Sequence, residues 1–247
     1  MSIAEVAASD EALTASAPVL ELVGVRAAYG PIEVLHGVDL AVRAGQVVAL
    51  LGPNGGGKST TVKVASGLLA PLAGDVRYAG RSVLGVSAEE AASLGVCTIP
   101  EGRGVFANLT VRENLWLATG TGPERAAVEE AAFARFPVLA DRRNQLAGSM
   151  SGGEQQMLAL SRALATDPAV LLLDELSMGL APMIVTRIYD TVGQLVEEGI
   201  SVLVAEQFAR TVLPIADVAA VMLNGRITAV GSPDDIAADL STAYLGA

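Results

Sequence analysis

Gly52-Pro53-Asn54-Gly55-Gly56-Gly57-Lys58-Ser59-Thr60 is a glycine-rich stretch that fits the phosphate-binding pattern G-x-x-x-x-G-K-[ST]. Residues 47–51 before it form an apolar run of strand length. After it, apolar residues recur at helical spacing at Val62, Ala65 and Leu69. The stretch therefore has the strand–loop–helix setting that a phosphate-binding loop requires.

The chemistry of this loop predicts a nucleotide site. Its glycines let consecutive backbone N–H groups surround an anion, and the start of the following helix adds a partial positive charge. Lys58 is expected to reach the β- and γ-phosphates, and the Ser59 hydroxyl is expected to bind Mg²⁺. Glycine-rich turns between a strand and a helix are common, but the lysine and the hydroxyl together argue against a plain structural turn.

The composition narrows the class of protein. The chain has 247 residues, enough for one large domain or two small ones with a packed core. The formal net charge is -11 without a long basic run, so nucleic acid is not expected as a partner. The hydrophobic fraction is 51%, yet no apolar run approaches the roughly 18–20 residues of a membrane-spanning helix. Cys97 is the single cysteine, so no disulfide framework is expected.

The order of patterns along the chain indicates an α/β fold. Residues 1–18 lack the features of a secretory signal, and we expect a disordered tail followed by a cytoplasmic domain over 19–247. Strands are predicted at 19–25, 34–42, 46–51, 74–78, 83–84, 96–99, 170–174, 201–205, 217–223 and 226–230. Helices are predicted at 88–94, 110–118, 123–136, 153–165 and 182–198, with a short one from Phe208. Strands alternating with helices indicate a parallel sheet covered on both faces, and the strand-free stretch 101–148 predicts a helical lobe.

A second candidate element is the apolar run 170–173, which is followed by Asp174 and Glu175. A buried strand that ends in acids places carboxylates at the carboxyl edge of the sheet, beside the phosphate loop. Asp174 is expected to hold Mg²⁺ through water, and Glu175 to position or deprotonate the attacking water. A pair of acids ending a strand is ordinary alone, so this assignment depends on the loop.

The third element is Ser151-Gly152-Gly153-Glu154-Gln155. Ser151 and Glu154 have the spacing of a capping box at the start of a helix. Capping does not explain the two glycines, because each lowers helix propensity by up to roughly 1 kcal/mol. Bare glycines let an anion approach the exposed amides, so we expect a second phosphate-binding helix start here.

In this order and spacing, the three elements resemble the ATPase subunit of an ABC transporter, and the resemblance covers about residues 19–247. It implies a P-loop NTPase (RecA-like) α/β core, an antiparallel β subdomain and an inserted helical subdomain at about 101–165. It also implies ATP and Mg²⁺ as cofactors and two such chains packed head to tail. The loop of one chain would then face the stretch from Ser151 to Gln155 of the other, with one ATP in each interface.

The resemblance assigns further residues. Tyr29 falls where the family stacks an aromatic ring on adenine, although a ring packed on the core is the alternative. Glu101 falls where the family usually has a Gln that touches the metal, and it is expected to act as a metal ligand. Gln207 takes the switch position of a usual His, so it can hydrogen-bond the γ-phosphate but cannot titrate near neutral pH. Ala181 replaces a common Asp, and Leu176 replaces a usual Pro. Glu175, Gln207 and Lys58 are the expected catalytic residues.

Three departures from the general family resemble branched-chain amino acid importers more narrowly: Pro100-Glu101-Gly102-Arg103, Ser177-Met178-Gly179-Leu180-Ala181-Pro182, and Gln207 after Glu206. This resemblance implies a motor on the cytoplasmic face of the inner membrane. Its expected partners are a second ATPase protomer, identical or related, two membrane permease subunits and, indirectly, a periplasmic-type solute-binding protein. The ATPase does not touch the solute, so urea, short amides or another small polar solute stay open as cargo.

Two regions and two other protein classes complete the expectations. Phe106 and Trp116 are expected either to line a groove for the membrane partner or to pack in the lobe core. A soluble ABC ATPase acting on ribosomes or DNA usually carries two ATPase units or long inserts, unlike this single compact unit. A GTP-binding switch needs an N/T-K-x-D motif, and neither Lys58 nor Lys63 has an Asp two residues later.

Overall fold

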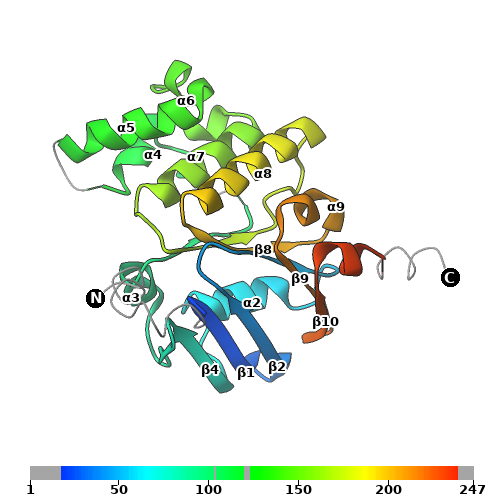
Figure 1. Ribbon diagram of the computed structural model, residues 1–247. Coiled ribbons are helices and arrows are strands. Elements are labelled where there is room, and N and C mark those ends of the chain that lie inside the picture. The colour runs from blue at the N-terminus through cyan, green and yellow to red at the C-terminus, as the bar shows by residue number, and fades with distance from the viewer. Residues whose placement is uncertain (1–17, 103, 120–122, 239–247) are drawn as a thin grey trace.

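A six-stranded sheet forms the centre of the computed structural model, which describes residues 18–102, 104–119 and 123–238 (Figure 1). Its strands lie in the order β10-β9-β3-β8-β7-β6; all neighbours pair in parallel except β10, which pairs antiparallel with β9. The bounds are β3 Val47–Leu51, β6 Val96–Ile99, β7 Val170–Asp174, β8 Ser201–Glu206, β9 Val218–Leu223 and β10 Arg226–Gly231. The predicted parallel sheet is confirmed.

Helices cover both faces of this sheet. Helix α2 (Lys58–Ala65) lies on one face, and helices α7 (Gly152–Leu164) and α8 (Pro182–Glu197) lie on the other (Figure 1). Alternate side chains of β3 enter two different hydrophobic cores, one shared with α7 and α8 and the other with α2. This double burial explains why β3 and β7 read as continuous apolar runs rather than as alternating patterns.

A four-stranded antiparallel sheet covers the other side of α2, in the order β2-β1-β4-β5 (Figure 1). Its strands are β1 Leu20–Tyr29, β2 Ile32–Val42, β4 Ala73–Tyr78 and β5 Arg81–Ser82. The predicted strand at 83–84 is wrong. Ala79 and Gly80 both have positive φ, 45° and 77°, and form a two-residue hairpin turn. Pairing therefore resumes at once, with Arg81 opposite Tyr78, and the strand ends before the apolar pair on which the prediction rested.

The segment between β6 and β7 is helical, as predicted. It contains α4 Val111–Trp116, α5 Pro123–Arg135, α6 Pro137–Asp141, the 3-10 turn η1 Ala147–Ser149 and α7. Thr110 begins α4 with a capping box, in which the Glu113 carboxylate accepts the Thr110 N–H (2.8 Å). Leu115, Phe136 and Leu139 are fully buried in its core. In the described parts of 101–165 there is no strand, only an isolated bridge between Thr110 and Leu146.

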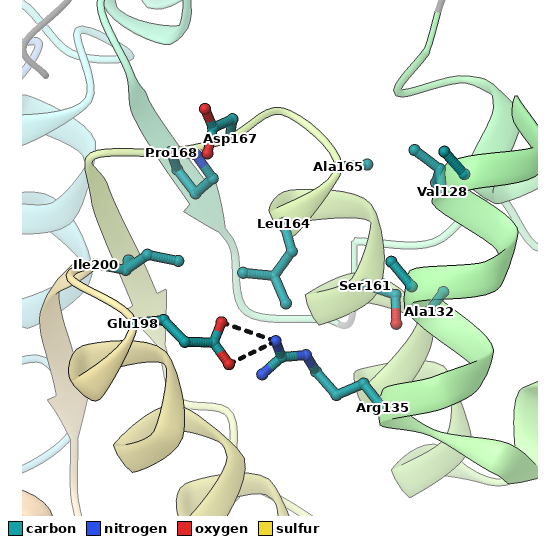
Figure 2. Close-up of a pocket in the computed structure, with 12 residues that line it drawn as sticks. Val128, Ala132, Arg135, Ser161, Leu164, Ala165, Asp167, Pro168, Glu198 and Ile200 are labelled. Atoms are coloured by element: carbon teal, nitrogen blue, oxygen red, sulfur yellow. Dashed lines mark hydrogen bonds and ion pairs between the residues drawn. The ribbon is translucent and has the colours of Figure 1, made fainter. Parts of the chain in front are cut away.

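One ion pair joins this helical part to the body of the protein. Figure 2 shows the Arg135 guanidinium, at the end of α5, reaching the Glu198 carboxylate at the end of α8 (2.8 Å) across a cavity of about 340 Å³. Both side chains are partly exposed, so the pair is a weak link. The remaining described helices are α3 Ala88–Ser93, α9 Ala209–Val212 and the 3-10 turn η2 Leu213–Ile215. Within the described ranges, no helix has both the length and the apolar character needed to cross a bilayer.

Candidate nucleotide site

The glycine-rich loop connects β3 to α2 and is supported by the hairpin of β9 and β10. A Cβ added to Gly52 would lie 2.2 Å from the Met222 carbonyl oxygen, so the backbones approach too closely for any side chain. The Gly225 N–H donates to the Gly56 carbonyl (2.8 Å). Gly57, with φ 110°, begins α2 without a side-chain cap, so no side chain of the described chain competes for its first N–H groups. The loop is built to receive an anion.

Lys58 lies buried at the start of α2, 3% exposed. Its Nζ donates to the Pro53 carbonyl oxygen (3.1 Å) and lies 3.1 Å from Oε1 of Glu175. The predicted phosphate-binding lysine and the predicted base are therefore brought together as a buried ion pair. A phosphate arriving at Lys58 would replace this internal partner.

Two of the three predicted magnesium ligands, Ser59 and Asp174, are in contact. The Ser59 hydroxyl donates to Oδ1 of Asp174 at the end of β7 (3.0 Å). The pKa of Asp174 is raised to about 6, mainly by burial and also by the charges of Glu175 and Glu101, against the opposing effects of Ser59 and Lys58. A hydroxyl and a carboxylate suit Mg²⁺, which prefers oxygen ligands and keeps several waters. Among the described residues, no three His, Cys, Asp or Glu side chains are arranged so that they could hold a metal ion together, so phosphate and water would supply the other ligands.

Glu175 adopts a left-handed backbone conformation, with φ 50°. Its N–H donates to the carbonyl of Ala205 in β8 (2.9 Å), which holds this unfavourable conformation in place. The next side chain, Leu176, is 1% exposed in the core between the sheet and α7. The position therefore requires an apolar residue, but nothing in the structure explains leucine rather than proline there.

The three residues assigned by resemblance alone lie around the loop with fewer contacts. Tyr29 ends β1, is 44% exposed, and lies beside Lys63 of α2, whose Nζ is 5.6 Å from the ring centre. This exposure disfavours a ring packed on the core. Glu101 is exposed after β6, and its charge acts on Asp174. Gln207 is exposed and directly follows β8, the strand that lies between β3 and β7 in the sheet.

The second predicted phosphate-binding helix start, at α7, has a different local structure. The Ser151 hydroxyl accepts the Glu154 N–H (3.4 Å), and the Glu154 carboxylate accepts the Ser151 N–H (2.9 Å), so the predicted capping box is confirmed. Glu154 also pairs with Arg142 (2.8 Å). Gln155 is buried and donates to the Ala147 carbonyl (2.8 Å). Gly153 is also buried. A Cβ at this position would lie 2.4 Å from Cγ2 of Ile184, so there is no room for a side chain.

Close packing against α8 thus explains why residue 153 is a glycine, an explanation that the sequence alone did not suggest. Helices α7 and α2 lie on opposite faces of the central sheet (Figure 1). The two predicted phosphate-binding helix starts therefore belong to helices on opposite faces of the sheet.

The two aromatic residues near the helical part differ. Phe106 is 52% exposed, with the Arg162 guanidinium 4.8 Å from its ring centre. Trp116 is half-buried between the guanidinium groups of Arg112 (4.7 Å) and Arg125 (4.9 Å), and its indole N–H donates to Glu129 (2.7 Å). Phe106 is thus available on the surface, whereas Trp116 is held by its own neighbours.

Sequence reasoning missed Glu206. This acid ends β8 as Asp174 ends β7, and it is 1% exposed. The signal was the same in both places, an acid at the end of an apolar strand, but only Asp174 was followed by a second acid. Glu206 also supports the loop through its main chain, since its carbonyl accepts the Gly52 N–H (3.3 Å).

Comparison with known proteins agrees with this geometry. Residues 35–177 match the family model described as ABC transporter. The branched-chain amino acid transport ATP-binding protein BraG of Pseudomonas aeruginosa is 43% identical over 202 residues, 81% of this chain and 86% of the relative. A probable branched-chain amino acid transport ATP-binding protein, LivF of Archaeoglobus fulgidus, is 34% identical over 88% of this chain and 93% of the relative.

Among solved structures, the ADP conformation of an ATP-binding cassette of an ABC transporter superposes with a TM-score of 0.79. It is 27% identical, and the match covers 93% of this chain and 99% of that one. The span that matches the family model, residues 35–177, includes the phosphate loop, the capped start of α7 and the acids at the end of β7. The chain therefore belongs to the ABC transporter family of ATP-binding subunits and is an ATPase.

Proposed function

We propose that the chain is the motor subunit of an importer that takes up branched-chain amino acids. The observation that carries the ATPase part is a pair of contacts between neighbouring residues: Lys58 pairs with Glu175, and Ser59 donates to Asp174. All four side chains lie where the carboxyl ends of β3 and β7 meet the start of α2.

The chemistry follows from these contacts. The loop from Gly52 to Thr60 binds the phosphates through its N–H groups, and Lys58 gives up Glu175 in order to bind the γ-phosphate. Released in this way, Glu175 orients the attacking water and accepts its proton. Ser59, Asp174 and Glu101 would hold Mg²⁺, which neutralises charge on the phosphates when bound. Tyr29 stacks on adenine, and Gln207 hydrogen-bonds the γ-phosphate.

A second protomer completes the site. The start of α7 lies across the central sheet from α2, so a head-to-tail partner is the way to bring Ser151 and Gly152 to a nucleotide bound at the loop. The partner's remaining N–H groups then contact the γ-phosphate. In this arrangement Glu154 and Gln155 act indirectly, since both side chains are engaged within their own protomer.

The cargo assignment is supported by the two relatives named for branched-chain amino acid transport and by the sequence features shared with that group. The motor would lie on the cytoplasmic face of the cell membrane, bound to two permease subunits. A solute-binding protein would deliver the amino acid from outside. Exposed Phe106 is a candidate contact for the permease.

The test is transport by the protein reassembled with its two permeases in vesicles. ATP-dependent uptake of leucine is expected with the wild-type chain, with urea and a short amide as competing solutes. Glu175→Gln should retain ATP binding but lose turnover by about 10²–10⁴-fold, because general-base assistance is lost. Gln207→Ala should lose less, because it removes no proton-transfer step.

Each outcome has a clear meaning. Near wild-type hydrolysis by Glu175→Gln would remove Glu175 from its role. Uptake of urea in preference to leucine would replace the proposed cargo and leave the ATPase assignment standing.

A further inference from the structure

Glu206 is the most buried charged side chain of the described chain, and the proposed mechanism does not use it. The ion pairs among the described residues do not include it. A carboxylate without a cationic partner is costly to bury, and apolar residues would fill a strand end at lower cost. Its contacts therefore call for a role other than stability.

Three neutral donors converge on this carboxylate. The Ser177 N–H donates to Oε1 (2.9 Å), and the Ser177 hydroxyl donates to Oε2 (2.8 Å). The Tyr189 hydroxyl of α8 donates to Oε1 as well. Burial, and then the charge of Glu206, raise the pKa of Tyr189 well above its usual value, so this hydroxyl keeps its proton and remains a donor. The carboxylate thus accepts hydrogen bonds from both the main chain and the side chain of Ser177.

These hydrogen bonds restrain the segment that contains Glu175. Ser177 is two residues beyond Glu175, and the Met178 N–H returns to the Glu175 carbonyl (3.3 Å). Two neighbouring residues of β8 hold the segment: the Ala205 carbonyl binds the Glu175 N–H, and the Glu206 carboxylate binds Ser177. Because the left-handed backbone of Glu175 is unfavourable, the hydrogen bond to Ala205 and the two contacts of Ser177 together hold the segment on both sides of it.

We infer that Glu206 is a positioning residue for ATP hydrolysis, which fixes Ser177 and thereby aims Glu175 at the attacking water. The inference rests on the proposed role of Glu175. Glu206 also directly precedes Gln207. Its buried side chain therefore fixes the segment that contains Glu175 relative to the end of β8, where Gln207 lies. Its main-chain contact to Gly52 does not depend on the side chain, so phosphate binding at the loop stays independent of this role.

The test separates kcat from ATP binding. Glu206→Ala leaves the three donors without their acceptor and should lower kcat by about 10²-fold, the scale expected for a misplaced catalytic group. Its Kd for ATP should stay near the wild-type value. Glu206→Gln can still accept from the Ser177 N–H and from Tyr189, while the Ser177 hydroxyl turns to accept from the new amide. This variant should keep most of the turnover.

A matched control removes the effect of lost stability. Val204 lies two residues earlier in β8, is fully buried, and has an apolar side chain that cannot hydrogen-bond Ser177. Val204→Ala should be destabilised towards urea yet keep its kcat. Equal losses of kcat in Val204→Ala and Glu206→Ala, or wild-type kcat in Glu206→Ala, would overturn the inference.

Further variants keep the test decisive. If Glu206→Ala does not fold, Ser177→Ala and Tyr189→Phe each remove one donor and should lower kcat partly; wild-type kcat in both would overturn the inference. Glu175→Gln, assayed in parallel, separates the two claims. If it retains turnover, the proposed base is wrong. If it alone loses turnover, only the role of Glu206 is wrong.

Discussion

The starts of helices α2 and α7 were both predicted to bind phosphate, and they differ in how their first N–H groups are treated. At α2 the chain provides a glycine cap with no capping side chain and no acid in the first turn. At α7 Ser151 and Glu154 form a capping box, so part of the helix start is already satisfied. An acid in the first turn also offsets the positive end of the helix dipole.

The difference shows that a glycine-rich helix start is not one kind of site. The start of α2 is open to an anion and has a buried lysine beside it. At α7 the Glu154 charge is balanced by Arg142, and Gly153 is occupied by packing against Ile184. In the proposed function, the first binds phosphate within one chain, whereas the second adds contacts to a phosphate already held by a partner.

The largest effect should come from Lys58→Ala, which removes the charge at α2. ATP affinity of the single protomer should fall by about 10–100-fold, because charged hydrogen bonds are worth about 1.5–3 kcal/mol. Calorimetric titration with ATP measures it. Lys63→Ala, in the same helix, is the comparison and should change affinity less, since Lys63 would act only through its contact with the Tyr29 ring. Equal losses in both variants would mean that general positive charge, rather than the loop geometry, binds ATP.

Gly153→Ala should destabilise the fold by about 1–3 kcal/mol, the usual cost of overpacking, while ATP affinity of the single chain stays unchanged. Urea unfolding measures the loss. The double variant Gly153→Ala/Ile184→Ala should cost less than the sum of its parts, because the new methyl fills the space that Ile184 leaves. Strict additivity would show that this glycine is not required by packing.

Ser151→Ala should have the smallest effect on stability, about 1 kcal/mol, through the lost cap. Thr110→Ala removes a similar capping box from α4 and should cost about as much. Only Ser151→Ala should also reduce ATP-driven dimerisation, which size-exclusion chromatography with light scattering can follow. A similar reduction in Thr110→Ala would attribute the change to helix stability, and the comparison of α2 with α7 would lose its functional meaning.

Local patterns were enough to predict most of the fold and the centre of the site. The loop from Gly52 to Thr60 follows β3, and the acids lie at the end of β7. Only β8 separates these two parallel strands, so the loop and the acids lie at the same edge of the sheet. The capping boxes at Thr110 and Ser151 depend on residues three apart, so the sequence contains them in full.

What the sequence did not reveal depends on contacts between distant segments. The requirement for glycine at position 153 comes from Ile184 of α8, and the left-handed backbone of Glu175 is held by a hydrogen bond to Ala205 of β8. The pairing of Lys58 with Glu175 appears only when both elements are placed. The error at residues 83–84 has a local cause, since apolar character outweighed a hairpin turn that ends at Gly80.

The support that Met222 and Gly225 give to the glycine-rich loop has a consequence for biosynthesis. The hairpin of β9 and β10 is translated long after the loop, because the two are far apart in the sequence. A nascent chain therefore contains the complete phosphate-binding motif well before the hairpin that supports its backbone exists. Nucleotide binding during synthesis should appear only once this hairpin has joined the sheet.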